Sequence, residues 1–151
     1  MRILLASSTI SENGGGISSY GLDFLKLMGV KNECYVLAGD IMDERNKSLI
    51  KDSYLLNSKD FSSVNLFKFL DLIKVIKPDV IVNSDFQLMS LAIPFIAIKV
   101  IKISISHFVD GEHAIVAGFN HRYYNNIIAL SNEGKMFLER FYKIRDTQII
   151  K

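Results

Sequence analysis

Short apolar runs alternate with longer amphipathic segments along the 151-residue chain. Such runs are typical of buried strands, whereas apolar residues at helical spacing indicate helices that pack on one face. The pattern predicts strands at Arg2–Ala6, Glu33–Ala38, Tyr54–Leu56, Asp79–Asn83, Lys99–Ser106, Asn126–Leu130 and Gln148–Lys151. It predicts helices at Ile17–Met28, from Ser62 or Ser63 to Ile76, from Ser84 to about Ala92, and after Ser131. The alternation favours one α/β domain, a Rossmann-like doubly wound and mostly parallel sheet with helices on both faces.

The predicted helix before Pro78 carries apolar residues at three-residue intervals. Ser62 or Ser63 is a good cap for its first turn, and proline is a frequent end signal. We expect the apolar stripe to pack in the core and not to bind a cofactor. Its members are Val64, Phe67, Leu70, Ile73 and Ile76.

Three consecutive glycines, Gly14, Gly15 and Gly16, join the first predicted strand to the first helix. Glycine lets a ligand approach the backbone closely, and the N-terminus of a helix attracts phosphate. A simple bend between strand and helix is the alternative interpretation. The loop lacks the Lys-Ser or Lys-Thr of a P-loop, and its glycines come too late after Ala6 for a dinucleotide fingerprint, which also needs Gly or Ala where Ser19 stands. We therefore predict a phosphate or glycan site of another kind.

In a doubly wound sheet, ligands bind outside the carboxyl ends of the strands. The glycine loop, the Asn83-Ser84-Asp85 turn and His107 all follow predicted strands, so we expect them at the same edge. An imidazole there can bond a sugar hydroxyl or a phosphate, or it can be a structural histidine bonded to a carbonyl. Asp110 and His113 lie just beyond His107, but their spacing matches no common metal site, and we predict no metal.

The composition argues against some classes of binding partner. A formal net charge of +2 and the lack of a basic stripe with interleaved aromatics argue against nucleic acid. The single cysteine, Cys34, lies in an apolar run and fits a reducing, cytoplasmic setting. Neither a signal peptide nor a transmembrane segment is expected, because Pro94, Lys99 and Lys102 interrupt the longest apolar tract. Peripheral contact with the inner face of a membrane stays open, although the scattered lysines form no polybasic patch.

The order of four motifs carries a family resemblance. These are the glycine loop, Lys77-Pro78-Asp79-Val80-Ile81, the Ser106-His107 strand end and Ile127-Ile128-Ala129-Leu130-Ser131. The chain resembles, over essentially all its residues, the amino-terminal domain of GT-B glycosyltransferases of the retaining family that includes bacterial glycan and lipopolysaccharide hexosyltransferases. The resemblance implies two Rossmann-like domains across a cleft. The amino-terminal one holds mostly the acceptor, and the other holds a nucleotide-activated sugar.

The resemblance also implies roles for individual residues. Gly15 and Gly16 match the Gly-Gly loop that approaches the donor diphosphate, and His107 matches a histidine near the transferred sugar. Ser131 matches a serine that begins a helix, for which its capping role is a sufficient explanation. Asn83, Asp85, Asp110 and the rest of the segment from His107 to Asn126 are expected on the acceptor side. These residues stand in a sequence of otherwise ordinary globular composition.

The resemblance leads us to expect an enzyme that moves a hexose from a nucleotide diphosphate sugar to a glycan or lipid-linked acceptor with retention. No cofactor besides the substrate nucleotide sugar is expected. Residues 1–151 are expected to be the amino-terminal domain of a longer protein, nearly inactive alone, because the basic pair and carboxylate motif of the family belong to the carboxy-terminal domain. The alternative is a stand-alone module that binds a nucleotide, a phosphorylated ligand or a partner domain, and a nicotinamide-dependent enzyme comes third.

Overall fold

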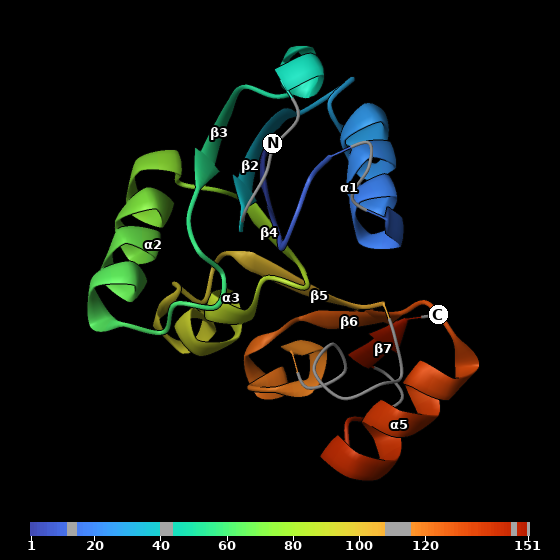
Figure 1. Ribbon diagram of the computed structural model, residues 1–151. Coiled ribbons are helices and arrows are strands. Elements are labelled where there is room, and N and C mark those ends of the chain that lie inside the picture. The colour runs from blue at the N-terminus through green and yellow to red at the C-terminus, as the bar shows by residue number, and fades with distance from the viewer. Residues whose placement is uncertain (12–14, 40–43, 108–115, 146–147, 151) are drawn as a thin grey trace.

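The computed structural model describes residues 1–11, 15–39, 44–107, 116–145 and 148–150. Strands and helices alternate along these segments (Figure 1). The strands are β1 (Arg2–Ser7), β2 (Glu33–Ala38), β3 (Asp52–Leu55), β4 (Val80–Ser84), β5 (Ile101–Ser106), β6 (Asn126–Ala129) and β7 (Ile149–Ile150). The α-helices are α1 (Gly15–Met28), α2 (Ser63–Ile76), α3 (Gln87–Ala92) and α5 (Asn132–Tyr142). Short 3-10 helices are η1 (Glu44–Leu49), η2 (Ile93–Phe95) and η3 (His121–Tyr123).

The strands of the described segments form one seven-stranded sheet in the order β3-β2-β1-β4-β5-β6-β7. All neighbouring strands are parallel. The chain runs outward from β1 to β3, returns to β4 on the other side of β1, and then continues outward to β7. This arrangement confirms the predicted doubly wound α/β fold, with the reversal of strand order between β1 and β4.

Helices cover both faces of the sheet, and each face has its own hydrophobic core. In Figure 1, α1 lies on one side of the sheet and α2 lies on the other. On the α1 side, Leu25 packs with Leu5 and Val36 of the first two strands. The opposite core contains Phe69 of α2 and Leu138 of α5, together with residues of α3. The continuous apolar runs of the inner strands thus reflect burial on both faces.

The apolar stripe predicted for α2 is wrong in part. Val64 and Phe67 are 62% and 64% exposed, whereas the core contacts come from Phe69 and Ile76. An α-helix has 3.6 residues per turn, so each three-residue step falls about 60° short of a full turn. A stripe at that interval therefore rotates from the buried face to the exposed face.

The ends of the helices follow the local sequence signals. The Ser62 hydroxyl accepts a hydrogen bond from the Asn65 amide at 3.2 Å, and that of Ser131 accepts one from the Gly134 amide at 3.0 Å. Lys77 ends α2 in a left-handed conformation with φ of 51°, directly before Pro78. Both serine caps were predicted. None of the helices in the described part of the chain is long and apolar enough to cross a membrane.

Candidate functional site

The site lies at the carboxyl ends of β1, β4 and β5, where the strand order reverses. Ser7 of β1 pairs in register with Ser84 of β4, and Ser84 pairs with Ile105 of β5. Because these strands are parallel and adjacent, the segments that follow them leave the sheet at one edge. We call this region, from Ser7 through Ser84 to His107, the carboxyl edge.

The first turn of α1 comes to this edge from β1. Gly15 begins the helix with φ of +74°, a conformation that favours glycine. The Ser18 hydroxyl accepts a hydrogen bond from the Ser11 amide at 3.1 Å, which ties the strand exit to the helix. Apart from the chain neighbours and the backbone of α1 itself, no atom of the described residues lies within 4 Å of a Cβ built at Gly15 or Gly16. The glycines thus present exposed backbone at the positive end of the α1 dipole.

His107 lies at the end of β5, as predicted, with its ring half-buried. Its Nε2 atom is 2.8 Å from the hydroxyl of Ser84, which is fully buried at the end of β4. The ring of Tyr20 meets the imidazole edge-on, with 5.3 Å between ring centroids. Burial raises the pKa of the Tyr20 phenol, so that this ring stays neutral near pH 7. Tyr20 of α1 and Ser84 of β4 therefore fix the orientation of the imidazole that follows β5.

Asp85 follows Ser84 in a left-handed conformation, with φ of 65° and only 7% of its surface exposed. For a residue with a Cβ this conformation costs about 1 kcal/mol, and such costs are common near functional sites. It also explains why α3 begins at Gln87 and not at the predicted Ser84, since the chain must turn before the helix can start. The turn places a carboxylate at the carboxyl edge.

Asn83 lies below this edge, and its side chain is completely buried. Its amide nitrogen donates to the Tyr124 hydroxyl at 2.9 Å, and its amide oxygen accepts from the Phe86 backbone at 2.9 Å. Burial raises the pKa of Tyr124 to about 12, against the opposing effect of its hydrogen bonds. These bonds connect β4, the start of α3 and Tyr124, which lies two residues before β6. The predicted contact of Asn83 with an acceptor stays a prediction, and the bonds found for it are internal.

No family model and no curated protein matches this sequence. Solved structures match its fold. HepE of Anabaena, crystallised with UDP and glucose, superposes with a TM-score of 0.70 at 16% identity, over 99% of this chain and 43% of HepE. In the UDP-glucose complex of HepE the TM-score is 0.71 at 15% identity. A glycosyltransferase from Rickettsia africae matches with a TM-score of 0.66 at 16% identity, over 99% of this chain and 41% of that enzyme.

The chain has the fold of one half of a GT-B glycosyltransferase. It spans about two fifths of the length of the solved chains it matches. At these identities the superposition establishes the backbone arrangement, and the roles of side chains have to be argued from their own geometry.

Some predicted site residues lie outside the described residues, namely Gly14 and Asp110. The same holds for His113, which was weighed as a metal ligand. In the described segments, no cluster of three or more His, Cys, Asp or Glu side chains could hold a metal ion. The described part of the carboxyl edge thus consists of Gly15, Gly16 and the Ser84–His107 pair, with Asp85 beside them.

The sequence interpretation missed the contacts of Tyr20 and Ser84 with His107. Tyr20 comes four residues after Gly16, so it lies on the same face of α1, one helical turn further along. Ser84 ends β4 beside β5, where it can reach the residue after the end of that strand. Strand order would have indicated both contacts, since they depend on β1, β4 and β5 being neighbours.

Proposed function

We propose that this chain is the amino-terminal, acceptor-side half of a glycosyltransferase with two domains. The enzyme moves a hexose from a nucleotide diphosphate sugar to a glycan or lipid-linked acceptor in polysaccharide biosynthesis, with retention of configuration. The supporting observation is the meeting of the α1 N-terminus and the Ser84–His107 pair at the carboxyl edge. HepE, a protein whose fold matches, was crystallised with UDP and with UDP-glucose.

Each group at the edge has a part in this proposal. The exposed backbone at Gly15 and Gly16 seats the donor diphosphate, because free amides and the helix dipole stabilise negative charge. His107, oriented by Ser84 and Tyr20, contacts a hydroxyl of the transferred sugar. Asp85 faces the acceptor. The nucleotide sugar is substrate, so the reaction needs no further cofactor on this side.

A carboxy-terminal domain supplies the remaining donor contacts in this proposal. Stabilisation of the leaving diphosphate is usually the largest contribution to such a transfer, and it requires positive charge placed at the phosphates. The groups that this proposal places at the carboxyl edge are an imidazole and backbone amides, and none of them is a lysine or arginine side chain. We therefore expect the isolated chain to be nearly inactive.

Calorimetric titration tests the division of labour between the two domains. UDP, GDP and UDP-glucose are titrated into this chain and into a version extended by the downstream coding sequence. We expect nucleotide binding to be at least about tenfold tighter in the extended protein, since most donor contacts lie in the second domain. Equally tight binding by the isolated chain would instead favour a stand-alone nucleotide-binding module.

Gly16→Leu in the extended protein tests the phosphate loop. The new side chain begins in open space over the first turn of α1, because a Cβ at this position meets no neighbouring side chain within 4 Å. We expect donor turnover to fall by at least about tenfold while the melting temperature is kept, because the diphosphate loses its approach to the backbone. Lys26→Leu, at an exposed position in the last turn of the same helix, is the matched control and leaves turnover unchanged. Unchanged turnover in Gly16→Leu would show that the glycines do not seat the diphosphate.

A further inference from the structure

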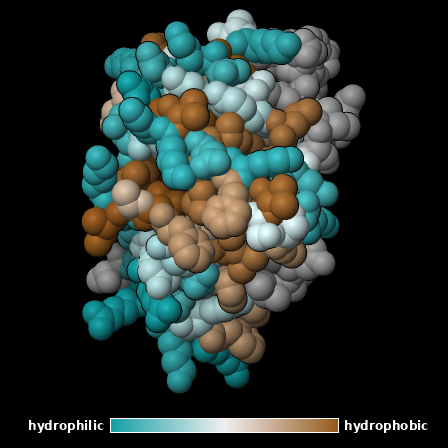
Figure 2. Space-filling view, turned by 90° about the vertical axis from the view of Figure 1, so that its left-hand side faces the viewer, coloured by the Kyte–Doolittle hydropathy of each residue, from teal (hydrophilic) through white to brown (hydrophobic). Residues whose placement is uncertain are grey.

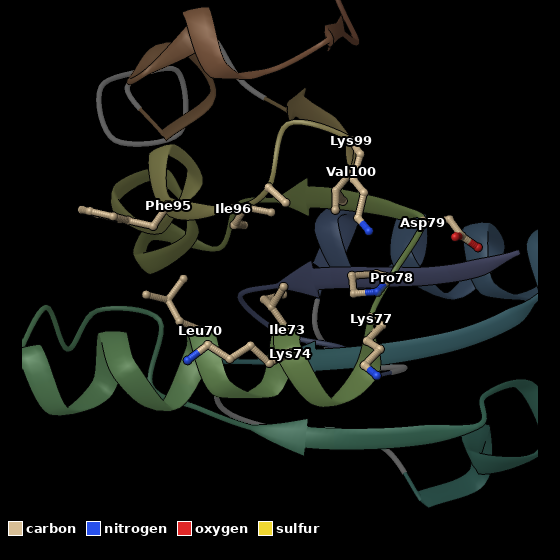
Figure 3. A pocket seen from close by; sticks show the side chains of 11 residues that line it. Leu70, Ile73, Lys74, Lys77, Pro78, Asp79, Phe95, Ile96, Lys99 and Val100 are labelled. Atoms are coloured by element: carbon tan, nitrogen blue, oxygen red, sulfur yellow. The ribbon is translucent and has the colours of Figure 1, made fainter.

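A second concave region lies away from the carboxyl edge. It is a groove of about 640 Å³ between α2 and the segment 93–100, and it reaches the amino ends of β4 and β5 at Asp79 and Val100. In Figure 3, Leu70 and Ile73 rise from α2 toward Phe95 and Ile96 across the groove. We call this region the amino-edge groove. None of the residues of the carboxyl edge lines it.

Large apolar side chains beside the amino-edge groove are exposed to water. Phe67 is 64% exposed, Phe95 is 69% exposed and Ile98 is 95% exposed. Figure 2 shows apolar side chains gathered across the middle of one face of the molecule, with hydrophilic side chains around them. Large contiguous apolar patches with a polar rim are uncommon on monomeric proteins and mark surfaces that bind a partner or a membrane.

The charge around this patch is positive. Segments 63–79 and 93–100 contain four lysines, Lys68, Lys74, Lys77 and Lys99, and only two carboxylates, Asp71 and Asp79. Asp71 forms a 2.9 Å ion pair with Lys74, and a carboxylate oxygen of Asp79 accepts a hydrogen bond from the Arg2 amide at 2.8 Å. Lys99 directly follows the exposed Ile98. The patch therefore combines protruding apolar side chains with an excess of cations.

We propose that the amino-edge groove and its exposed rim are a docking surface for a membrane that contains anionic lipid. Phe95 and Ile98 enter the boundary between headgroups and acyl chains, and the lysines meet the lipid phosphates. An isologous contact with a second copy would bring the lysines of both copies together, which disfavours that occupant. A nearly fully exposed Ile98 gains most from a fluid apolar medium, which needs no complementary pocket.

The absence of tryptophan from the sequence allows a direct test. Ile98→Trp places a single fluorophore at the exposed loop tip, and Met136→Trp places one at another exposed apolar residue, 66% exposed, on α5 as control. Each variant is titrated with vesicles of phosphatidylglycerol and phosphatidylcholine at a ratio of roughly 3:7, and with pure phosphatidylcholine vesicles. We expect a blue shift of the emission only for Ile98→Trp with anionic vesicles, reduced by salt. No shift, or equal shifts in both variants, would overturn the proposal.

Vesicle cosedimentation of variants without tryptophan separates the two contributions. We expect Phe95→Ser combined with Ile98→Ser to abolish binding, and Lys99→Glu to weaken it by about tenfold, since each lysine contributes about fivefold at an anionic surface and reversal adds repulsion. The matched controls are Met136→Ser combined with Phe141→Ser on α5, and Lys51→Glu, all at exposed residues that do not line the groove. Equal losses in the controls would contradict a specific docking surface.

The oligomeric state is measured on the same samples by light scattering. A dimer of the parent chain that the Phe95→Ser, Ile98→Ser variant converts to monomers would assign the surface to a second copy and overturn the proposal. The membrane assay uses neither nucleotide nor acceptor. Its failure would therefore leave the glycosyltransferase proposal intact, and failure of the nucleotide titration would leave the docking proposal intact.

Discussion

The carboxyl edge and the amino-edge groove differ in the surroundings of their side chains. At the carboxyl edge, polar side chains are buried and bonded to one another, as in the 2.8 Å contact of Ser84 with His107. At the amino-edge groove, apolar side chains such as Phe95 and Ile98 face water. The first arrangement stabilises the folded chain and orients an imidazole. The second arrangement contributes little to folding, and it leaves these side chains available for an external contact.

The comparison teaches where substitutions reveal function in this fold. A buried polar group that loses its partner costs free energy of folding, so variants below the carboxyl edge will affect stability and site geometry together. Exposed apolar groups can be replaced with little effect on folding, so variants of the groove report on binding alone. The predictions below test this difference from the largest expected effect to the smallest.

Among variants of the polar groups at and below the carboxyl edge, Asn83→Ala should cause the largest loss of stability. It leaves the buried Tyr124 hydroxyl and the Phe86 amide without their 2.9 Å partners. We expect the free energy of unfolding to fall by about 3 kcal/mol, from urea denaturation. Asn132→Ala, at the exposed start of α5, is the control and should change it by less than about 0.5 kcal/mol. Equal effects of the two would show that the Asn83 bonds do not organise this edge.

High pH should weaken the same network through Tyr124. Its folded pKa of about 12 lies above the ordinary value of 10.0, so the folded state holds this proton more tightly than the unfolded state. The stabilisation is complete below pH 10 and is lost as the pH rises toward 12. Two pKa units correspond to roughly 2 to 3 kcal/mol. The measurement is the difference in unfolding free energy between the parent chain and Tyr124→Phe across this window, and a constant difference would contradict the buried phenol.

Ser84→Ala should have a smaller effect on stability and a specific effect on His107. Loss of the buried hydroxyl removes the contact with Nε2 and costs about 1 kcal/mol. Nitrogen NMR of the His107 ring should report a changed tautomer balance, because one ring nitrogen loses its fixed partner. Ser63→Ala, an exposed serine at the start of α2, should leave the ring signals unchanged. An unaltered His107 spectrum in Ser84→Ala would show that Ser84 does not orient the ring.

Phe95→Ser should have the smallest effect on folding, within about 0.5 kcal/mol, because the ring is already 69% exposed. Phe86→Ser is the contrast, with a ring that is completely buried, and should cost about 3 to 5 kcal/mol. Thermal and urea unfolding of both variants give the comparison. A large loss of unfolding free energy in Phe95→Ser would show that this side chain belongs to the hydrophobic core. Variants of the groove could then not report on binding separately from stability.

Local sequence signals were sufficient for most elements and for part of the site. The glycines at the start of α1, His107 after β5 and the Ser131 cap are each readable from a strand end or a capping residue followed by a helix. The buried face of α2 was predicted wrongly in part, because the three-residue spacing does not keep Phe67 on that face. The contacts among Tyr20, Ser84 and His107 depend on three strands that are distant in sequence, so no local pattern contains them.

The sequence by itself determined the alternation of strands and helices and the edge at which polar groups gather. Periodicity, caps and glycine placement act over a few residues, and parallel crossovers then bring strand ends to one side of the sheet. Only the tertiary structure decided that Asn83 is an internal hydrogen-bonding partner, while Asp85 stays at the edge in a left-handed turn. It also decided that Phe95 and Ile98 remain in water. Burial depends on which elements become neighbours, and that is a property of the whole fold.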